Sequence, residues 1–182
     1  MSEFTPLDTK RLILRRITLN DAPDLFAYRS LPEVALYQSW KPDTLAEAER
    51  FILNTLKSEP GEADSWIQLA VCLKEGTLIG DIGIHYLSPQ QIELGYTLNP
   101  HYQKQGYAYE ALSALIDRLF IQDHNHRMTA SADPDNLSSI RLLVKLGFRK
   151  EAHFKKSFYL NGQWYDDVLY AILEEEWILR KR

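Results

Sequence analysis

Alternation between apolar and polar positions predicts a first strand over residues 9–18. Leu12 and Leu14 fall on one face of that strand, while Arg11 and Ile13 fall on the other. Such alternation is typical of a strand with one face turned toward a core. The chain is therefore expected to begin its fold with a half-buried strand.

Two helices are predicted after this strand. Asn20 and Asp21 offer side-chain oxygens that can cap the start of the first helix. Thr44 and Glu47 have the spacing of a capping box, in which each side chain accepts a hydrogen bond from the other residue's backbone N–H. We therefore expect a second helix over residues 44–57.

The period of the apolar positions changes to that of strands from residue 65 onward. Residues 65–74 and 78–87 predict two strands joined by a short turn that contains Gly76. Residues 91–98 predict a third strand. Together they indicate a meander in one sheet.

The most regular helical pattern in the chain follows. Apolar residues recur there at steps of three and four, which places them on one helix face: Ala108, Ala111, Leu112, Leu115, Ile116, Leu119 and Phe120. This segment is expected to be an amphipathic helix that covers the sheet.

The C-terminal third predicts a strand, a helix and a hairpin. The strand spans residues 127–132, and the helix spans 136–146 and ends at Gly147, where a left-handed backbone favours glycine. Residues 148–173 predict a hairpin that turns at Asn161-Gly162. The whole order favours one α/β (α+β) domain over residues 1–182, with helices on a mixed sheet of about seven strands.

Composition narrows the possible functions of this domain. Of its 182 residues, 21 are Lys or Arg and 25 are Asp or Glu, and the net charge of −4 argues against nucleic-acid binding by bulk charge. One cysteine excludes a disulfide framework and a cysteine-rich zinc site, so no metal is expected. The longest run without Asp, Glu, Lys or Arg is residues 82–92, too short to span a membrane, and residues 1–10 hold no signal-peptide core. We expect a cytoplasmic protein.

The loop at residues 101–108 is the first candidate for a binding site. It lies between a predicted strand and a predicted helix, where free backbone N–H groups and the positive end of the helix dipole favour phosphate. Gly106 would let a ligand approach the backbone closely. The chain has neither of the glycine-rich nucleotide motifs GxxxxGK[ST] and GxGxxG.

Two motifs resemble those of the GNAT superfamily of N-acetyltransferases. Gln103-x-x-Gly106-x-Ala108 is similar to the loop that binds the pyrophosphate of acyl-CoA in that family, with alanine where glycine is frequent. Asn136-x-x-Ser139, followed by residues 145–148 (KLGF), resembles the second family block. The match is strongest to the RimJ/RimL-type branch, whose members acetylate protein N-termini and various small amines.

The resemblance implies a GNAT fold, acetyl-CoA as co-substrate and direct transfer of its acetyl group to a primary amine. It assigns the binding of CoA to ten residues: Thr97, Leu98, Gln103, Lys104, Gln105, Gly106, Tyr107, Ala108, Asn136 and Ser139. The pantetheine arm would lie beside Thr97 and Leu98, and the backbone N–H of Leu98 would donate to the thioester oxygen. Ser139 would donate to the departing sulfur. Asn136 would bind a pantetheine amide, or it would simply cap the helix.

Glu93 is the candidate base, because it is the only charged residue between residues 82 and 103 apart from the histidines. The alternative is an exposed strand residue without a catalytic role. The aromatic residues Tyr37, Trp40 and Tyr86 are candidates for the border of the acceptor site, or they belong to the core.

The acceptor itself stays open between two chemical classes. One is the N-terminus of a ribosomal or other protein, and the other is a small amine such as an antibiotic or a polyamine. A third hypothesis is a domain that binds acyl-CoA without turnover.

Overall fold

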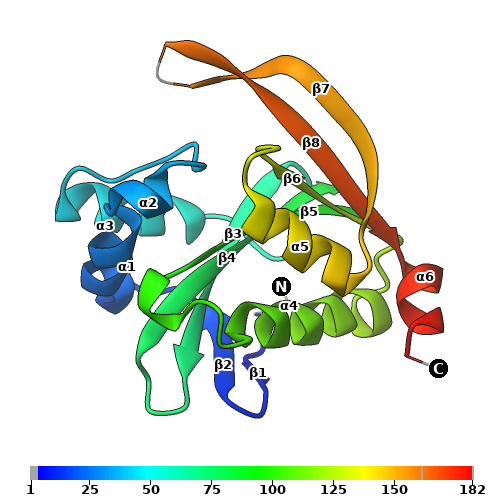
Figure 1. Ribbon diagram of the computed structural model, residues 1–182. Coiled ribbons are helices and arrows are strands. Elements are labelled where there is room, and N and C mark those ends of the chain that lie inside the picture. Colours follow the sequence, from blue (N-terminus) through cyan, green and yellow to red (C-terminus); the bar gives the residue numbers. More distant parts are fainter. Residues whose placement is uncertain (1–3, 161, 182) are drawn as a thin grey trace.

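The computed structural model describes residues 4–160 and 162–181, which form a single sheet flanked by helices (Figure 1). Asn161 of the predicted turn lies outside these residues. Within them the sheet has eight strands, in the order β1-β2-β3-β4-β5-β6-β8-β7. The strands are β1 (Leu7–Asp8), β2 (Leu12–Arg16), β3 (Ser65–Leu73), β4 (Leu78–Ser88), β5 (Gln91–Leu98), β6 (Arg127–Ala132), β7 (Arg149–Leu160) and β8 (Gln163–Leu173).

The sheet is mixed and mostly antiparallel, as the sequence predicts. The β5–β6 pair is parallel, and every other pairing of neighbouring strands is antiparallel. The eighth strand is β1, which has two residues and is too short for any periodicity to reveal.

The helices are α1 (Ala22–Arg29), α2 (Pro32–Ala35), α3 (Leu45–Thr55), α4 (Tyr107–Asp117), α5 (Leu137–Leu146) and α6 (Glu174–Leu179). The short helices α2 and α6 were not predicted. The helix predicted through Phe120 leaves α-geometry after Asp117 and continues as a π-helical segment, η3 (Arg118–Gln122). No helix of the described residues is long and apolar enough to cross a membrane.

Two of the predicted helix caps differ from the structure. Asp21 does not cap α1 but accepts hydrogen bonds from the backbone N–H and hydroxyl of Thr18 and from Arg15. Thr44 does accept from the N–H of Glu47, at 3.3 Å. The Glu47 carboxylate, however, accepts from the N–H of Asp43 at 2.8 Å, so the predicted capping box is only half formed.

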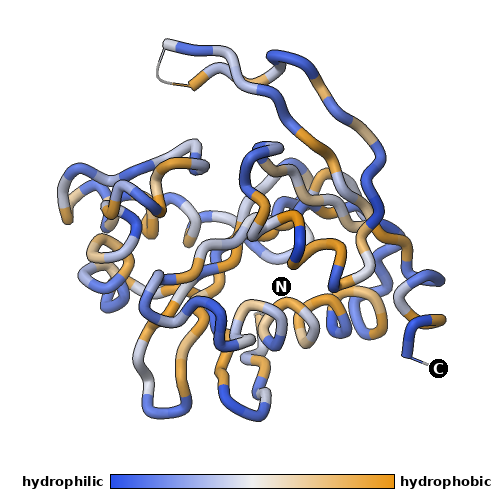
Figure 2. The backbone as a smooth tube through the Cα atoms, viewed as in Figure 1, coloured by the Kyte–Doolittle hydropathy of each residue, from blue (hydrophilic) through white to orange (hydrophobic). Residues whose placement is uncertain are grey.

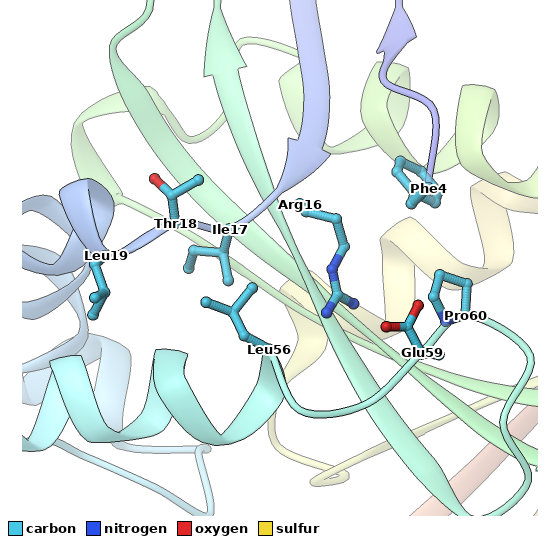
Figure 3. A pocket seen from close by; sticks show the side chains of 8 residues that line it. All are labelled: Phe4, Arg16, Ile17, Thr18, Leu19, Leu56, Glu59 and Pro60. Atoms are coloured by element: carbon cyan, nitrogen blue, oxygen red, sulfur yellow. The ribbon is translucent and has the colours of Figure 1, made fainter. Parts of the chain in front are cut away.

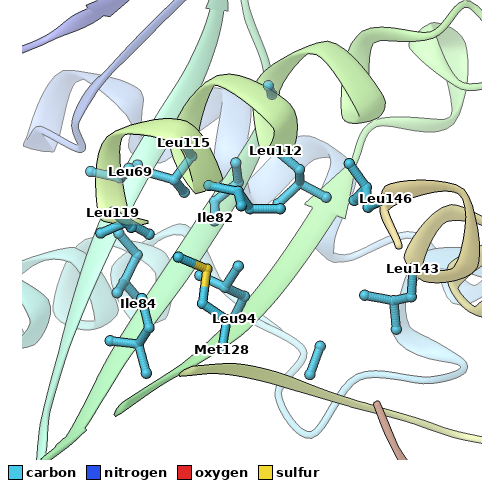
Figure 4. Packing of buried hydrophobic residues seen from close by; sticks show 14 of the residues in the cluster. Leu69, Ile82, Ile84, Leu94, Leu112, Leu115, Leu119, Met128, Leu143 and Leu146 are labelled. Atoms are coloured by element: carbon cyan, nitrogen blue, oxygen red, sulfur yellow. The ribbon is translucent and has the colours of Figure 1, made fainter. Parts of the chain in front are cut away.

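The main core lies between α4 and one face of the sheet (Figure 4). Leu112, Leu115 and Leu119 of α4 pack there against strand residues that include Ile82 and Leu94. Figure 2 shows hydrophobic positions along the sheet-facing side of α4 and hydrophilic ones in the loops. The predicted amphipathic helix is thereby confirmed.

A second core lies on the opposite face of the sheet. Ala70 and Cys72 of β3 belong to it, whereas Val71 between them belongs to the main core, as strand alternation requires. Leu25 of α1 and Ile52 of α3 complete the packing. The two helices therefore cover only the β2–β4 side of this face.

A buried carboxylate fastens α1 to the sheet. Asp81 of β4 is fully buried and accepts hydrogen bonds from Tyr28 and Arg29 of α1 and from Gln68 of β3. Burial is the main cause that raises the pKa of Tyr28 well above its usual value, and the Asp81 charge adds to it. The Tyr28 phenol thus remains a donor to Asp81.

The β7–β8 hairpin extends beyond the body of the molecule (Figure 1) and bends at a bulge. Its register shifts between Phe154 and Phe158. The Asp166 carboxylate of β8 accepts from Lys155 Nζ at 2.8 Å and from the N–H of Lys156 at 2.9 Å. Lys156 has a positive φ of 47°, so the bulge is a defined backbone conformation held by one side chain.

Replacing Asp81 should destabilise the fold strongly. Asp81→Asn would leave the buried Arg29 guanidinium without its counter-charge, and breaking such a pair costs about 3–5 kcal/mol. The free energy of unfolding from urea titration checks this. Asp43→Asn, at an exposed loop carboxylate, is the control and should change it by less than about 0.5 kcal/mol. Equal changes in the free energy of unfolding for the two variants would contradict the role of Asp81 as the anchor of α1.

Candidate active site

Strands β5 and β6 pair over only three residues and then separate. Their parallel register is Gln91 with Arg127, Ile92 with Met128 and Glu93 with Thr129. β6 continues to Ala132 in full register with β8 on its other side. In the described part of the chain, β5 therefore has a free backbone edge beyond Glu93.

Strand alternation identifies the backbone groups on this free edge. The Ile92 carbonyl accepts from the side-chain hydroxyl of Thr129 in β6 at 3.3 Å, whereas the Asn99 N–H donates to the carbonyl of Ile79 in β4 at 2.9 Å. The register of β5 against β4 is regular between these two points. Hence Leu94, Tyr96 and Leu98 direct their N–H and C=O groups into the opening between β5 and β6.

Thr97 and Leu98, which were both predicted to contact CoA, direct their backbone groups to opposite sides of β5. Leu98 faces the opening, and because its carbonyl accepts from the Gln103 side chain at 3.1 Å, its N–H is what it can offer to a ligand. Thr97 directs its backbone toward β4, opposite Asp81, and its side chain is buried. A narrow cavity between β5 and the start of α4 is bordered by Thr97, Leu98 and also Ala108.

The predicted phosphate loop lies at the exposed start of α4. Gly106 is the N-cap residue with a φ of 83°, a left-handed conformation that glycine adopts without strain. Residues 103–106 are exposed. The first backbone N–H groups of a helix have no partner within it, so those from Gln105 to Ala108 are placed to bind an anion.

Arg11, which the sequence analysis did not single out as a site residue, holds this loop. Its Nη1 donates to the Gln105 carbonyl at 3.0 Å, and its Nε donates to Glu110 of α4 at 2.6 Å. The guanidinium also lies over the Tyr107 ring, 4.2 Å from its centroid. The shape of the loop thus depends on a residue at the start of β2.

The second motif begins α5 on the far side of the opening. The Asn136 side chain accepts from the N–H of Ser139 at 3.2 Å. Asn136 therefore caps α5, which was the alternative to its binding of a pantetheine amide. The Ser139 hydroxyl oxygen lies 2.8 Å from the hydroxyl oxygen of Tyr96. Burial raises the pKa of Tyr96 to about 12.

Glu93 lies on the sheet face that α1 and α3 leave uncovered at this end. Its Oε2 is 3.4 Å from Nδ1 of His85, the residue opposite it on β4. The other ring nitrogen of His85 is 3.4 Å from Asp64, and the ring stacks on Trp66 with centroids 4.6 Å apart. The Glu93 side chain is 29% exposed, so it is accessible but not isolated on the surface.

The three aromatic candidates do not meet in one place. Tyr37 is exposed, and its hydroxyl donates to the Asp135 carbonyl before α5 at 3.4 Å. Trp40 stacks on Phe51 of α3 with centroids 4.4 Å apart. Tyr86 belongs to the main core, on the sheet face opposite His85 and Glu93. Of the two predicted roles for Tyr86, the one in the core is therefore the one that the structure shows.

A separate pocket of about 420 Å³ lies between the end of β2 and the segment after α3 (Figure 3). Arg16, Leu56 and Glu59 line it, and none of the predicted site residues does. It is therefore a feature distinct from the opening between β5 and β6. Among the described residues, no three His, Cys, Asp or Glu side chains gather in a way that could hold a metal ion.

The opening between β5 and β6 and the loop before α4 lie within a recognised family domain. The acetyltransferase (GNAT) domain matches residues 11–149. The uncharacterized N-acetyltransferase YnaD of Bacillus subtilis is 35% identical over 173 residues, which cover 94% of this chain and 98% of that protein.

Two further similarities bear on fold and function. The crystal structure of a GNAT-family acetyltransferase from Bacillus anthracis superposes with a TM-score of 0.85 at 30% identity, covering 94% of this chain and all of that one. The [ribosomal protein uS5]-alanine N-acetyltransferase of Escherichia coli is 39% identical over 84 residues, which are 46% of this chain and 43% of that protein. The chain belongs to the GNAT family and is an acetyl-CoA-dependent N-acetyltransferase.

Proposed function

We propose that this enzyme acetylates the N-terminal amine of a peptide or protein, with Glu93 as the base. The observation that supports acetyl transfer at this place is the free edge of β5, which runs from beyond Glu93 toward the start of α4. It provides a continuous path between a carboxylate and an anion-binding helix terminus. The partial similarity to the uS5-alanine N-acetyltransferase supports a protein acceptor.

The residues present fit acetyl-CoA, which supplies the acetyl group as a thioester when it is bound. The amide groups of a pantetheine chain need backbone partners, and Leu94, Tyr96 and Leu98 offer them. The N–H groups from Gln105 to Ala108 would hold the phosphates. The Leu98 N–H, or one of its two equivalents along the edge, would stabilise the negative charge that develops on the carbonyl oxygen.

Glu93 would accept the proton that the attacking ammonium must lose, directly or through one water molecule. Its exposed fraction leaves it open to the acceptor, and Asp64 adds a second carboxylate beyond His85. These two negative charges favour the approach of a cationic amine.

The exposed hairpin supports a peptide rather than a small acceptor. Phe158, Tyr159 and Trp164, which follow one another closely across the hairpin turn, are between 41% and 59% exposed. Exposed aromatic side chains of this kind are enriched where proteins contact other chains. A small amine would not need a surface so far from the β5–β6 opening.

An acceptor panel tests the substrate class. Purified enzyme with acetyl-CoA is offered peptides with a free N-terminus, the same peptides with a blocked N-terminus, and small amines including spermidine, and CoA release is followed. We expect turnover with the free peptides. Turnover confined to the small amines would overturn the peptide proposal, and binding without any turnover would favour the non-catalytic alternative.

Glu93→Gln should lower kcat/KM by about 10²-fold, the lower end of the usual contribution of general-base catalysis. The loss should be greatest at low pH, where removing the proton from the amine is hardest. The pH profile of kcat/KM measures this. Glu75→Gln, in the β3–β4 turn, is the matched control, and a Glu93 variant with the profile of that control would remove Glu93 from the mechanism.

Gly106→Asp should weaken acetyl-CoA binding by at least about tenfold, because it adds a negative charge where phosphate would bind. Calorimetry measures the Kd. Gly76→Asp is the control, since Gly76 also has a positive φ, of 99°, but lies in the β3–β4 turn, with open space around it and outside the loop before α4. The control adds the same charge and a comparable backbone strain at another place, so it isolates the effect of the position, and equal Kd values for the two variants would place the phosphates elsewhere.

A further inference from the structure

Tyr96 connects the two sides of the β5–β6 opening through its hydroxyl group. The residue lies on β5, and its hydroxyl oxygen is 2.8 Å from Ser139 Oγ and 3.3 Å from the Ser139 carbonyl oxygen on α5. Tyr96 and Ser139 are 43 positions apart in the chain. The contact is therefore a tertiary feature of the opening.

Either hydroxyl can donate in this hydrogen bond, and the Tyr96 hydroxyl also donates to the Ser139 carbonyl oxygen at 3.3 Å. Burial raises the pKa of the phenol to about 12, so Tyr96 remains protonated and able to donate throughout the neutral range. The Ser139 N–H is already engaged with the Asn136 side chain at 3.2 Å. When Tyr96 donates to Ser139 Oγ, the hydrogen of the serine hydroxyl is free to turn toward another acceptor.

We propose that Tyr96 is a positioning residue for Ser139: its hydroxyl donates to Ser139 Oγ and so directs the Ser139 O–H toward the sulfur of CoA. The inference rests on the proposed role of Ser139 as the donor to that sulfur. It assigns Tyr96 a task that the family motifs do not include, since Tyr96 lies outside both of them.

The chemistry of the step balances without a proton from Tyr96. Glu93 takes one proton from the ammonium, and the resulting amine nitrogen forms the new C–N bond. Its second proton passes to water as the tetrahedral adduct collapses, and the C–S bond breaks with its electron pair left on sulfur. Ser139 stabilises the resulting negative charge by a hydrogen bond. Tyr96 strengthens that bond, because a hydroxyl that accepts one hydrogen bond donates another more strongly.

A double-mutant cycle tests whether Tyr96 acts through Ser139. Tyr96→Phe removes only the hydroxyl and should lower kcat about three- to tenfold, the worth of one hydrogen bond, with little change in the KM of the amine. Tyr96→Phe introduced into Ser139→Ala should have no further effect. Tyr170→Phe, at a buried tyrosine of β8, is the control and should match the wild type.

A spectroscopic measurement gives a readout that does not depend on turnover. The Raman S–H band of bound CoA is titrated against pH in the binary complex, with Cys72→Ala as background because Cys72 is the single protein cysteine. Wild-type protein should stabilise the thiolate and lower the pKa of the bound thiol. Tyr96→Phe and Ser139→Ala should each raise that pKa, and the double variant should equal Ser139→Ala.

The possible results separate this inference from the proposed function. If Tyr96→Phe leaves both kcat and the thiol titration unchanged, or if its effects add to those of Ser139→Ala, the positioning role is wrong. If wild-type protein shows the thiol shift but acetylates no peptide, the peptide proposal fails while the Tyr96 inference stands. Circular dichroism and thermal unfolding of each variant check that the fold is kept.

Discussion

The separation of β5 from β6 is the constraint on which the site depends. β6 pairs along its whole length with β8, and it can follow β5 only over three residues before the two strands diverge. Backbone N–H and C=O groups that lose their strand partner must be paired in another way. The free edge of β5 therefore leaves backbone groups open to an extended ligand, and the helix terminus beyond Leu98 leaves N–H groups open to an anion.

The helices on the two faces of the sheet are fixed by different means. On one face, α4 packs through a continuous apolar stripe, and its first turn is held by the contacts of Arg11 with Gln105 and Glu110. On the other face, α1 is held by the buried carboxylate of Asp81. Asp81 lies opposite Thr97 in the β4–β5 ladder, so the anchor of α1 and the free edge of β5 share one strand pair. A shift of either helix would move the backbone that faces the ligand.

Sequence periodicity predicts most of the elements, because each depends on residues close together in the chain. The strands of the meander, the amphipathic α4 and the glycine at the end of α5 all follow from local patterns. The contacts that build the site do not: Arg11 and Glu110 are 99 positions apart, and His85 meets Glu93 only because of the β4–β5 register. The predicted cap at Asp21 was wrong for a local reason, since its carboxylate accepts hydrogen bonds from Arg15 and Thr18 instead of capping α1. The left-handed Gly106 is the exception, a site feature that its own sequence neighbourhood reveals.

The bulge in the β7–β8 hairpin has a consequence for the behaviour of the protein at high concentration. β7 is the last strand of the sheet, and an outer strand offers unpaired backbone groups to which strands of other molecules can add. The bulge between Phe154 and Phe158 of β7 breaks the straight run that such addition requires, and the bulge carries Lys155 and Lys156. The exposed aromatic residues of the hairpin thus lie on an arm that resists aggregation through its own backbone geometry.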